Sequence, residues 1–83
     1  MFYTYAIFSE KFNKIYIGYT SNIEQRLIDH NERSTKGFTV KYRPWRLVHL
    51  EEFDSKKMAF NREKQLKSAK GRQFIWSLIK NSG

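Results

Sequence analysis

The sequence predicts an α+β fold in which a three-stranded antiparallel sheet is flanked by helices. Two observations lead to this prediction. The chain opens with two short runs rich in aromatic and β-branched residues, separated by a polar turn, whereas its last third carries apolar residues at helical spacing. A further alternating run lies between these regions. We therefore expect the element order β-β-α-β-α-α.

Length and composition limit what the chain can form. Eighty-three residues, of which 40% are hydrophobic, close one modest core, so we expect a single domain over residues 1–83. The absence of cysteine excludes a disulfide scaffold and thiolate zinc sites and fits a cytoplasmic location. No segment reads as a membrane span, and we expect no membrane partner.

The first two strands are predicted to form a hairpin. Residues 2–8 and 14–19 share the β-favouring character, and the polar residues 9–13 connect them. Side chains alternate between the two faces of a strand. Tyr5 therefore shares a face with its odd-numbered neighbours, and Tyr16 points away from the isoleucines beside it, toward a groove.

A helix is predicted to follow this hairpin. Ser21 and Glu24 have the spacing of a capping box, which satisfies backbone donors at a helix start. Within the helix, Ile23, Arg26 and His30 fall on one face, with the latter two separated by one turn. We expect Arg26 and His30 to be stacked neighbours.

The middle of the chain is predicted to be a loop followed by the third strand. Residues 31–44 hold four basic residues and several turn-forming ones, which indicates a mobile basic loop over the surface. Residues 45–53 alternate well enough to be a strand. Strict alternation places Val48 and Leu50 on one face and Leu47 on the other.

Two helices are predicted to complete the fold. Either Asp54 or Ser55 caps the first of them, which we expect to run to about Ala69. Gly71 then interrupts the helical pattern, and a last amphipathic helix follows it.

The buried face of the first of these helices is open from the sequence. One arc contains Glu63 and is formed by Ala59, Phe60 and Leu66. It would turn the carboxylate toward the sheet, where the charge requires a cation or a metal ion. A second arc, marked by Met58 and Ala69, places Arg62 at the centre and Glu63 at the margin. Alternatively, Glu63 only pairs with Lys67 one turn later, an interaction of about 0.3–0.5 kcal/mol.

Charge is distributed unevenly along the chain. Residues 1–54 carry eight basic and seven acidic residues, whereas residues 55–83 carry eight basic residues and one acidic residue. Such a basic region indicates a phosphate-bearing partner, although a solvated basic face is the alternative. The basic residues expected to follow a DNA backbone are Lys36, Lys41, Lys64, Lys67, Lys70 and Arg72.

Several short motifs occur in an order and spacing that are specific as a set. These motifs are Tyr3-Thr4-Tyr5, Tyr16-Ile17-Gly18, the run from Thr20 to Leu27, His30-Asn31 and the run from Arg62 to Lys67. Together they resemble the GIY-YIG nuclease superfamily, in particular its short single-domain bacterial members. The resemblance spans residues 2–79. It implies the same sheet and helices, and it implies divalent-metal-dependent cleavage of DNA.

The resemblance also implies roles for individual residues. Tyr5 and Tyr16 match the tyrosines of the first and second motifs, Arg26 matches the helix arginine, and Glu63 matches the metal-binding carboxylate. Glu63 would hold Mg²⁺, with Mn²⁺ as a second possibility, and Arg26 would stabilise charge on the phosphate. One tyrosine would deprotonate the attacking water, and His30 is an alternative proton acceptor. Which tyrosine acts is left open.

The chain departs from the family pattern at two places. The first motif has Tyr3 and Thr4 where the family has glycine and isoleucine. Many larger relatives also carry an asparagine beyond the metal-binding glutamate, and none lies between Glu63 and Ile79.

We therefore expect a small magnesium-dependent endonuclease that hydrolyses DNA, with structured or damaged DNA in repair or recombination as its substrate. Basic contacts to the backbone predict weak sequence specificity. One alternative is a non-catalytic nucleic-acid-binding module that recruits another nuclease. Another is a protein-interaction domain whose basic surface binds an acidic partner. A carboxylate placed beside phosphates favours the enzyme, because binding alone does not require it.

Overall fold

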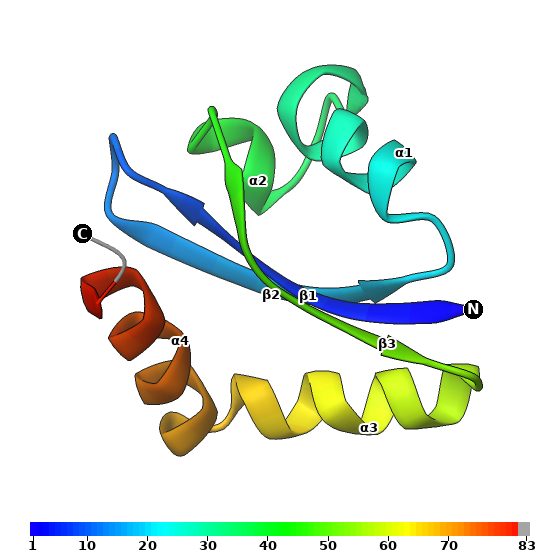
Figure 1. Cartoon of the computed structure of the whole chain (residues 1–83). Coiled ribbons are helices and arrows are strands. Elements are labelled where there is room, and N and C mark those ends of the chain that lie inside the picture. Colours follow the sequence, from blue (N-terminus) through cyan, green and yellow to red (C-terminus); the bar gives the residue numbers. More distant parts are fainter. Residues whose placement is uncertain (82–83) are drawn as a thin grey trace.

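A computed structural model describes residues 1–81 and shows a sheet between two layers of helices (Figure 1). The strands are β1 (Phe2–Ser9), β2 (Lys14–Thr20) and β3 (Arg46–Phe53), in the antiparallel order β2-β1-β3. One layer contains α1 (Ile23–Ile28), the π-helical turn η1 (Asp29–Arg33) and α2 (Phe38–Lys41). The other contains α3 (Lys56–Lys67) and α4 (Ala69–Asn81). The predicted α+β fold and element order are confirmed.

The two faces of the sheet carry separate core clusters. On the face covered by α1, the buried cluster consists of Tyr5, Ile7 and Trp45. On the face covered by α3 and α4, it consists of Ala6, Phe8, Ile15, Ile17, Leu66 and Ile75. The predicted alternation of the hairpin is therefore confirmed, because Tyr5 and Tyr16 pack on the α1 face, away from the isoleucines of β2.

The strict alternation predicted for β3 is wrong. The register between β1 and β3 shifts between Ala6 and Ile7, which leaves Val48 as an extra residue in β3. Val48 packs against the cluster on the α3–α4 face, whereas Leu50 lies opposite Tyr5, whose side chain belongs to the other face. The bulge therefore separates Val48 and Leu50.

Helix α1 begins one residue later than predicted. Its N-cap is Asn22, whose Oδ1 accepts a hydrogen bond from the backbone N–H of Gln25 at 3.1 Å. The hydroxyl of Thr20 accepts in turn from the N–H of Asn22 at 3.1 Å. The capping box predicted for Ser21 and Glu24 is wrong because asparagine caps a helix as well as serine does.

Residues 31–44 are not the loop that was predicted. They contain the end of η1 and all of α2, and Arg43 donates hydrogen bonds of 2.6–3.1 Å to three main-chain carbonyl oxygens of residues 29–34. The side chain of Asn31 accepts from the N–H of Trp45 and donates to its carbonyl oxygen. Arg43 therefore satisfies backbone acceptors of this segment instead of facing only solvent.

The structure decides which residue caps α3 and which of its two apolar arcs is buried. Ser55 is the N-cap, since its hydroxyl accepts from the N–H of Met58 at 3.2 Å. Ala59 and Leu66 are fully buried, whereas the side chain of Met58 is exposed. The buried arc is therefore the one that contains Glu63, although Phe60, which was predicted to belong to it, is 38% exposed.

The junction of α3 and α4 also differs from the prediction. α3 ends at Lys67, and the hydroxyl of Ser68 accepts from the N–H of Gly71 at 3.2 Å at the start of α4. Gly71 therefore lies in the first turn of α4 and does not interrupt a helix. A Cβ atom there would lie 2.3 Å from the carbonyl oxygen of Gln65, so the two helices meet this closely only with glycine.

No helix within residues 1–81 has both the length and the apolar character needed to cross a lipid bilayer.

Candidate active site

Four of the five predicted catalytic residues line one hollow at the β2 edge of the sheet. The residues around it are Tyr5, Tyr16, Gly18, Tyr19, Thr20, Arg26 and Glu63. Arg26 comes from α1 and Glu63 from α3, which cover opposite faces of the sheet (Figure 1). They meet because β2 is an edge strand, around which side chains from both layers reach.

The fifth residue, His30, lies behind Tyr5 in a chain of hydrogen bonds. The Nε of Arg26 donates to the hydroxyl oxygen of Tyr5 at 3.4 Å, and that hydroxyl lies 2.7 Å from Nε2 of His30. Nδ1 of His30 lies 3.0 Å from the hydroxyl of Thr39. Tyr5, His30 and Thr39 are all buried. Arg26 and His30 are thus linked through Tyr5.

The direction of these hydrogen bonds follows from the chemistry of the donors. A guanidinium group only donates, so the hydroxyl of Tyr5 accepts from Arg26. We assign the proton of this hydroxyl to the hydrogen bond with Nε2 of His30, since this arrangement gives each of the four side chains a donor or acceptor partner. A neutral imidazole then carries its proton on Nδ1 and donates it to Thr39. The four side chains form one directed chain that starts at the hollow and ends inside the protein.

The local backbone brings His30 and Thr39 into this chain. His30 lies in the π-helical turn η1, where the N–H of Ser34 bonds to the carbonyl oxygen of Asp29 at 2.9 Å. Such turns are rare and recur at functional sites. Thr39 is fixed by its own carbonyl oxygen, which accepts from the indole N–H of Trp45 at 2.7 Å.

Burial keeps two groups of this hydrogen-bonded series, Tyr5 and His30, uncharged. It raises the pKa of Tyr5 to about 12, although the hydrogen bond from Arg26 opposes this change. Burial, together with the positive charge of Arg26, lowers the pKa of His30 to about 4. At neutral pH, Tyr5 is therefore a neutral phenol and His30 a neutral imidazole. The pKa of Arg26 is raised by its hydrogen bond to Tyr5, so the guanidinium stays charged.

Gly18 leaves room for the hydroxyl of Tyr5 at the wall of the hollow. The two residues lie opposite each other on β2 and β1. A Cβ atom on Gly18 would lie 2.7 Å from the hydroxyl oxygen of Tyr5, closer than real Cβ contacts, and 3.2 Å from the ring of Tyr16, which is tighter than most of them. The glycine of the Y-I-G motif is thus required by the space that the two tyrosines occupy.

Glu63 is the one carboxylate among the described residues that line the hollow, and its side chain is 13% exposed. It also makes the predicted ion pair with Lys67, whose Nζ lies 3.5 Å away. The described part of the chain holds no group of three or more histidine, aspartate or glutamate ligands. A magnesium ion fits these donors, because it keeps most of its waters and binds through one or two carboxylates and substrate phosphates.

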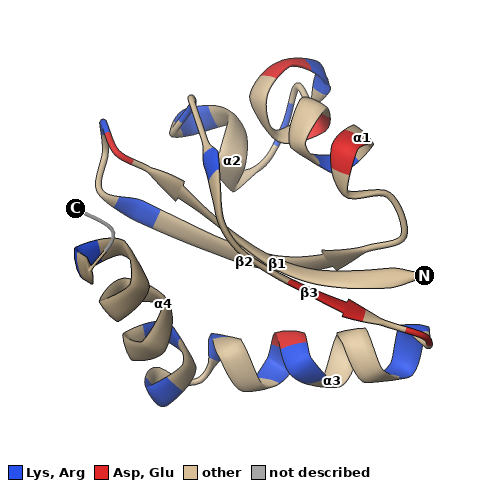
Figure 2. Cartoon of the chain, viewed as in Figure 1, with Lys and Arg blue, Asp and Glu red and all other residues tan. Residues whose placement is uncertain are grey.

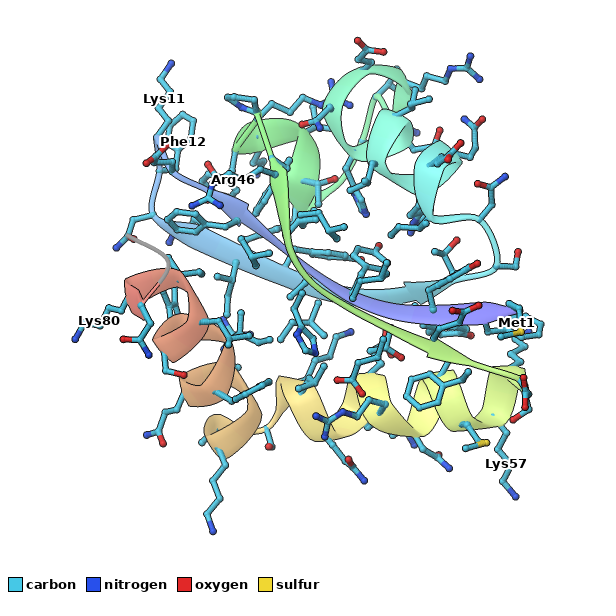
Figure 3. All side chains as sticks on the ribbon, viewed as in Figure 1. Met1, Lys11, Phe12, Arg46, Lys57 and Lys80 are labelled. Carbon is cyan, nitrogen blue, oxygen red and sulfur yellow. The ribbon has the colours of Figure 1, made fainter. Side chains whose placement is uncertain are left out.

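The six predicted DNA-binding residues come from α2, the segment before it, α3 and α4. Lys67 and Arg72 line a groove beside Tyr16, next to the hollow. Lys64 lies over the ring of Phe60, and Lys70 lies at the junction of α3 and α4. The remaining two, exposed in or before α2, are Lys36 and Lys41. Figure 2 shows basic residues along α3 and α4, and Figure 3 shows Lys57 and Lys80 extending outward from these helices.

Sequence reasoning missed two residues that complete the site. Thr39 holds the far side of His30, and Arg43 binds the carbonyl oxygens of η1. Both lie in the segment interpreted as a loop, where no periodicity marks them. Their spacing from His30, nine and thirteen residues, corresponds to no regular element.

The family of the chain is shown by its sequence. A sequence model of the GIY-YIG catalytic domain matches residues 1–75, and the chain therefore belongs to this family of nucleases, which generally depend on divalent metal ions. The resemblance predicted from the motifs is confirmed.

The relatives of the chain include small proteins from archaea and bacteria that carry the name UPF0213. The protein from Natronomonas pharaonis is 43% identical over 65% of this chain and 64% of its own length. The protein from Bacillus velezensis is 39% identical over 76% of this chain and 67% of its own length. The protein from Staphylococcus haemolyticus is 41% identical over 70% of this chain and 71% of its own length. The chain thus spans about two thirds of these relatives, and no solved structure matches it.

The contact between Gly18 and Tyr5 predicts a specific coupling. Gly18→Ala should destabilise the protein by about 1–3 kcal/mol because the fully buried Tyr5 must move. In Tyr5→Phe, which lacks the nearest atom, the same change should cost less. A double-mutant cycle measured by urea unfolding tests this. If the two substitutions change the free energy of unfolding additively, the contact between Gly18 and Tyr5 is contradicted.

The lowered pKa of His30 predicts a loss of stability in acid. The unfolded chain binds a proton on this imidazole below pH 6.5, whereas the folded chain binds it only near pH 4. Stability is therefore full above pH 6.5 and falls toward pH 4, by about 2–3 kcal/mol from this group. His30→Gln, which cannot be charged, should lose less stability between pH 7 and pH 4.5. Equal losses in urea unfolding of the two proteins would show that His30 is not held neutral.

Proposed function

We propose that this chain is a metal-dependent endonuclease that hydrolyses DNA phosphodiester bonds. The observation that supports this most directly is the hollow shared by Glu63, Arg26 and the hydroxyl of Tyr5, side chains supplied by three different elements. A carboxylate, a cation and a hydroxyl around one space can bind a metal ion, a phosphate and a water. When bound at Glu63, Mg²⁺ or Mn²⁺ neutralises charge on the phosphate and on the leaving oxygen.

Arg26 is the phosphate-binding residue of this proposal. Its Nε donates to Tyr5, its guanidinium also interacts with Tyr16, and its side chain lines the hollow. A guanidinium fork matches two phosphate oxygens and stabilises the charge that develops during cleavage. Because this guanidinium stays charged, Arg26 needs no change of protonation to act.

Tyr5 and His30 are proposed to accept the proton of the attacking water together. As the water gives a proton to the oxygen of Tyr5, the proton of Tyr5 passes to Nε2 of His30, 2.7 Å away. His30 ends as an imidazolium. In the free protein its pKa of about 4 makes it a weak acceptor, and the negative charge of a bound phosphate raises that pKa. Tyr16, which also lines the hollow, is the other candidate for first acceptor.

The basic residues are proposed to bind the DNA backbone. Contacts to phosphates position a nucleic acid without reading its sequence. The substrate would then be chosen by its shape, as in the flapped, branched or damaged DNA of repair and recombination.

A second candidate function is a nucleic-acid-binding module without catalysis. The ion pair of Glu63 with Lys67 favours it, because Lys67 competes with a metal ion for the carboxylate. Under this alternative, the hollow binds a phosphate and the chain recruits another nuclease.

Cleavage of labelled DNA distinguishes the two candidates. We expect the native chain to cut at least one of single-stranded, duplex, flapped and branched DNA when Mg²⁺ or Mn²⁺ is present. Glu63→Gln should lower the rate by about 100-fold or more. Glu52→Gln, which changes an exposed carboxylate of β3 outside the hollow, is the matched control and should cut normally. Tight binding by the native chain without cleavage of any substrate would leave the binding module as the better account.

A further inference from the structure

A groove lies beside the hollow along the same edge strand. The residues that line it are Ile15, Tyr16, Ile17, Phe38, Lys67 and Arg72. Tyr16 belongs to both the groove and the hollow. Tyr16 and Gly18 are two positions apart on the strand, a distance of about 7 Å. A chain molecule bound in the hollow therefore continues directly into the groove.

One side of the groove is an aromatic surface. Phe38 is 45% exposed although three rings pack near it, those of Tyr16, Tyr42 and Trp45, at centroid distances of 6.3, 4.7 and 6.1 Å. The rings of Phe38 and Tyr16 are inclined by only 26°. Phe38 is thus supported from within and leaves part of its ring free for a flat ligand.

The other side of the groove is basic. Lys67 comes from α3 and Arg72 from α4, and no carboxylate is among the described residues that line the groove. The ammonium group of Lys67 also lies 3.5 Å from Glu63, so this cation lies between the groove and the hollow. A row of cations beside an exposed aromatic ring is the arrangement that holds single-stranded nucleic acid, with phosphates on the cations and bases on the ring.

We propose that the groove holds an unpaired base of the nucleotide next to the phosphate in the hollow. The base stacks on Phe38, and the backbone follows Lys67 and Arg72. This inference rests on the proposed function, because it assumes that the hollow binds a phosphate. A base inside a duplex is stacked and paired and does not reach Phe38 without being extruded. The chain should therefore prefer DNA whose bases are unpaired beside the bound phosphate.

Binding without cleavage tests this directly. The Glu63→Gln chain is titrated into fluorescent oligothymidine, a strand of equal length that lacks bases, and a duplex, and anisotropy is measured. Oligothymidine should bind about 5–100-fold more tightly than the strand without bases, since stacking contributes this much for each base. It should also bind more tightly than the duplex.

Four variants distinguish the contribution of base stacking from that of charge. Phe38→Leu keeps an apolar side chain without a flat ring and should remove most of the preference for bases, as should Phe38→Ala. Phe74→Ala changes an equally exposed phenylalanine (41%) on α4 outside the groove and should keep the preference. Arg72→Ala should weaken both single strands alike and lower the salt dependence. Thermal unfolding checks that each variant is folded.

Three results would overturn the inference. They are equal binding of the strands with and without bases, equal effects of the Phe38 and Phe74 variants, and binding of the duplex as tight as that of oligothymidine. Failure of the proposed function looks different. A base preference that depends on Phe38, in a native chain that cuts no DNA, supports the groove and rejects the nuclease, whereas cleavage without a base preference does the opposite.

Discussion

The hydroxyl of Tyr5 is the group on which the rest of the site depends. It lies on the central strand, fully buried, and its hydrogen bonds to Arg26 and His30 join α1 and η1 to the sheet. Thr39 extends the same chain into α2. Because each buried polar group requires a partner, removing one member leaves another unsatisfied. The position of the arginine and the need for glycine opposite Tyr5 both follow from this one oxygen.

The strand order explains how so small a chain assembles a site from both of its helical layers. With β2 at the edge, Arg26 from one layer and Glu63 from the other reach the same hollow. Gly18 adds no side chain there, so the space stays open. The same edge continues into the groove that contains Phe38, and basic residues of α3 and α4 lie along it. The arrangement supports a phosphate site with an adjoining binding surface for a strand.

Local patterns in the sequence were sufficient for the strands, for the main helices and for the family motifs. Local patterns were not sufficient where the backbone conformation depends on a contact with a residue distant in the sequence. The bulge at Val48 depends on the register with β1, and the close junction at Gly71 depends on the end of α3. The turn η1 is held by Arg43, which the sequence shows only as one more basic residue. The hydrogen bond of Thr39 to His30 could not be predicted for the same reason.

The whole site depends on His30 being a neutral imidazole that accepts a hydrogen bond from the hydroxyl of Tyr5 through Nε2. Nitrogen-15 NMR of the imidazole in the native protein tests this most directly. At pH 7 we expect a neutral ring with its proton on Nδ1, and a titration midpoint near pH 4, because burial lowers the pKa of His30 to about that value. A midpoint near 6.5, or a proton found on Nε2 at pH 7, would contradict the directed chain from Arg26 to Thr39.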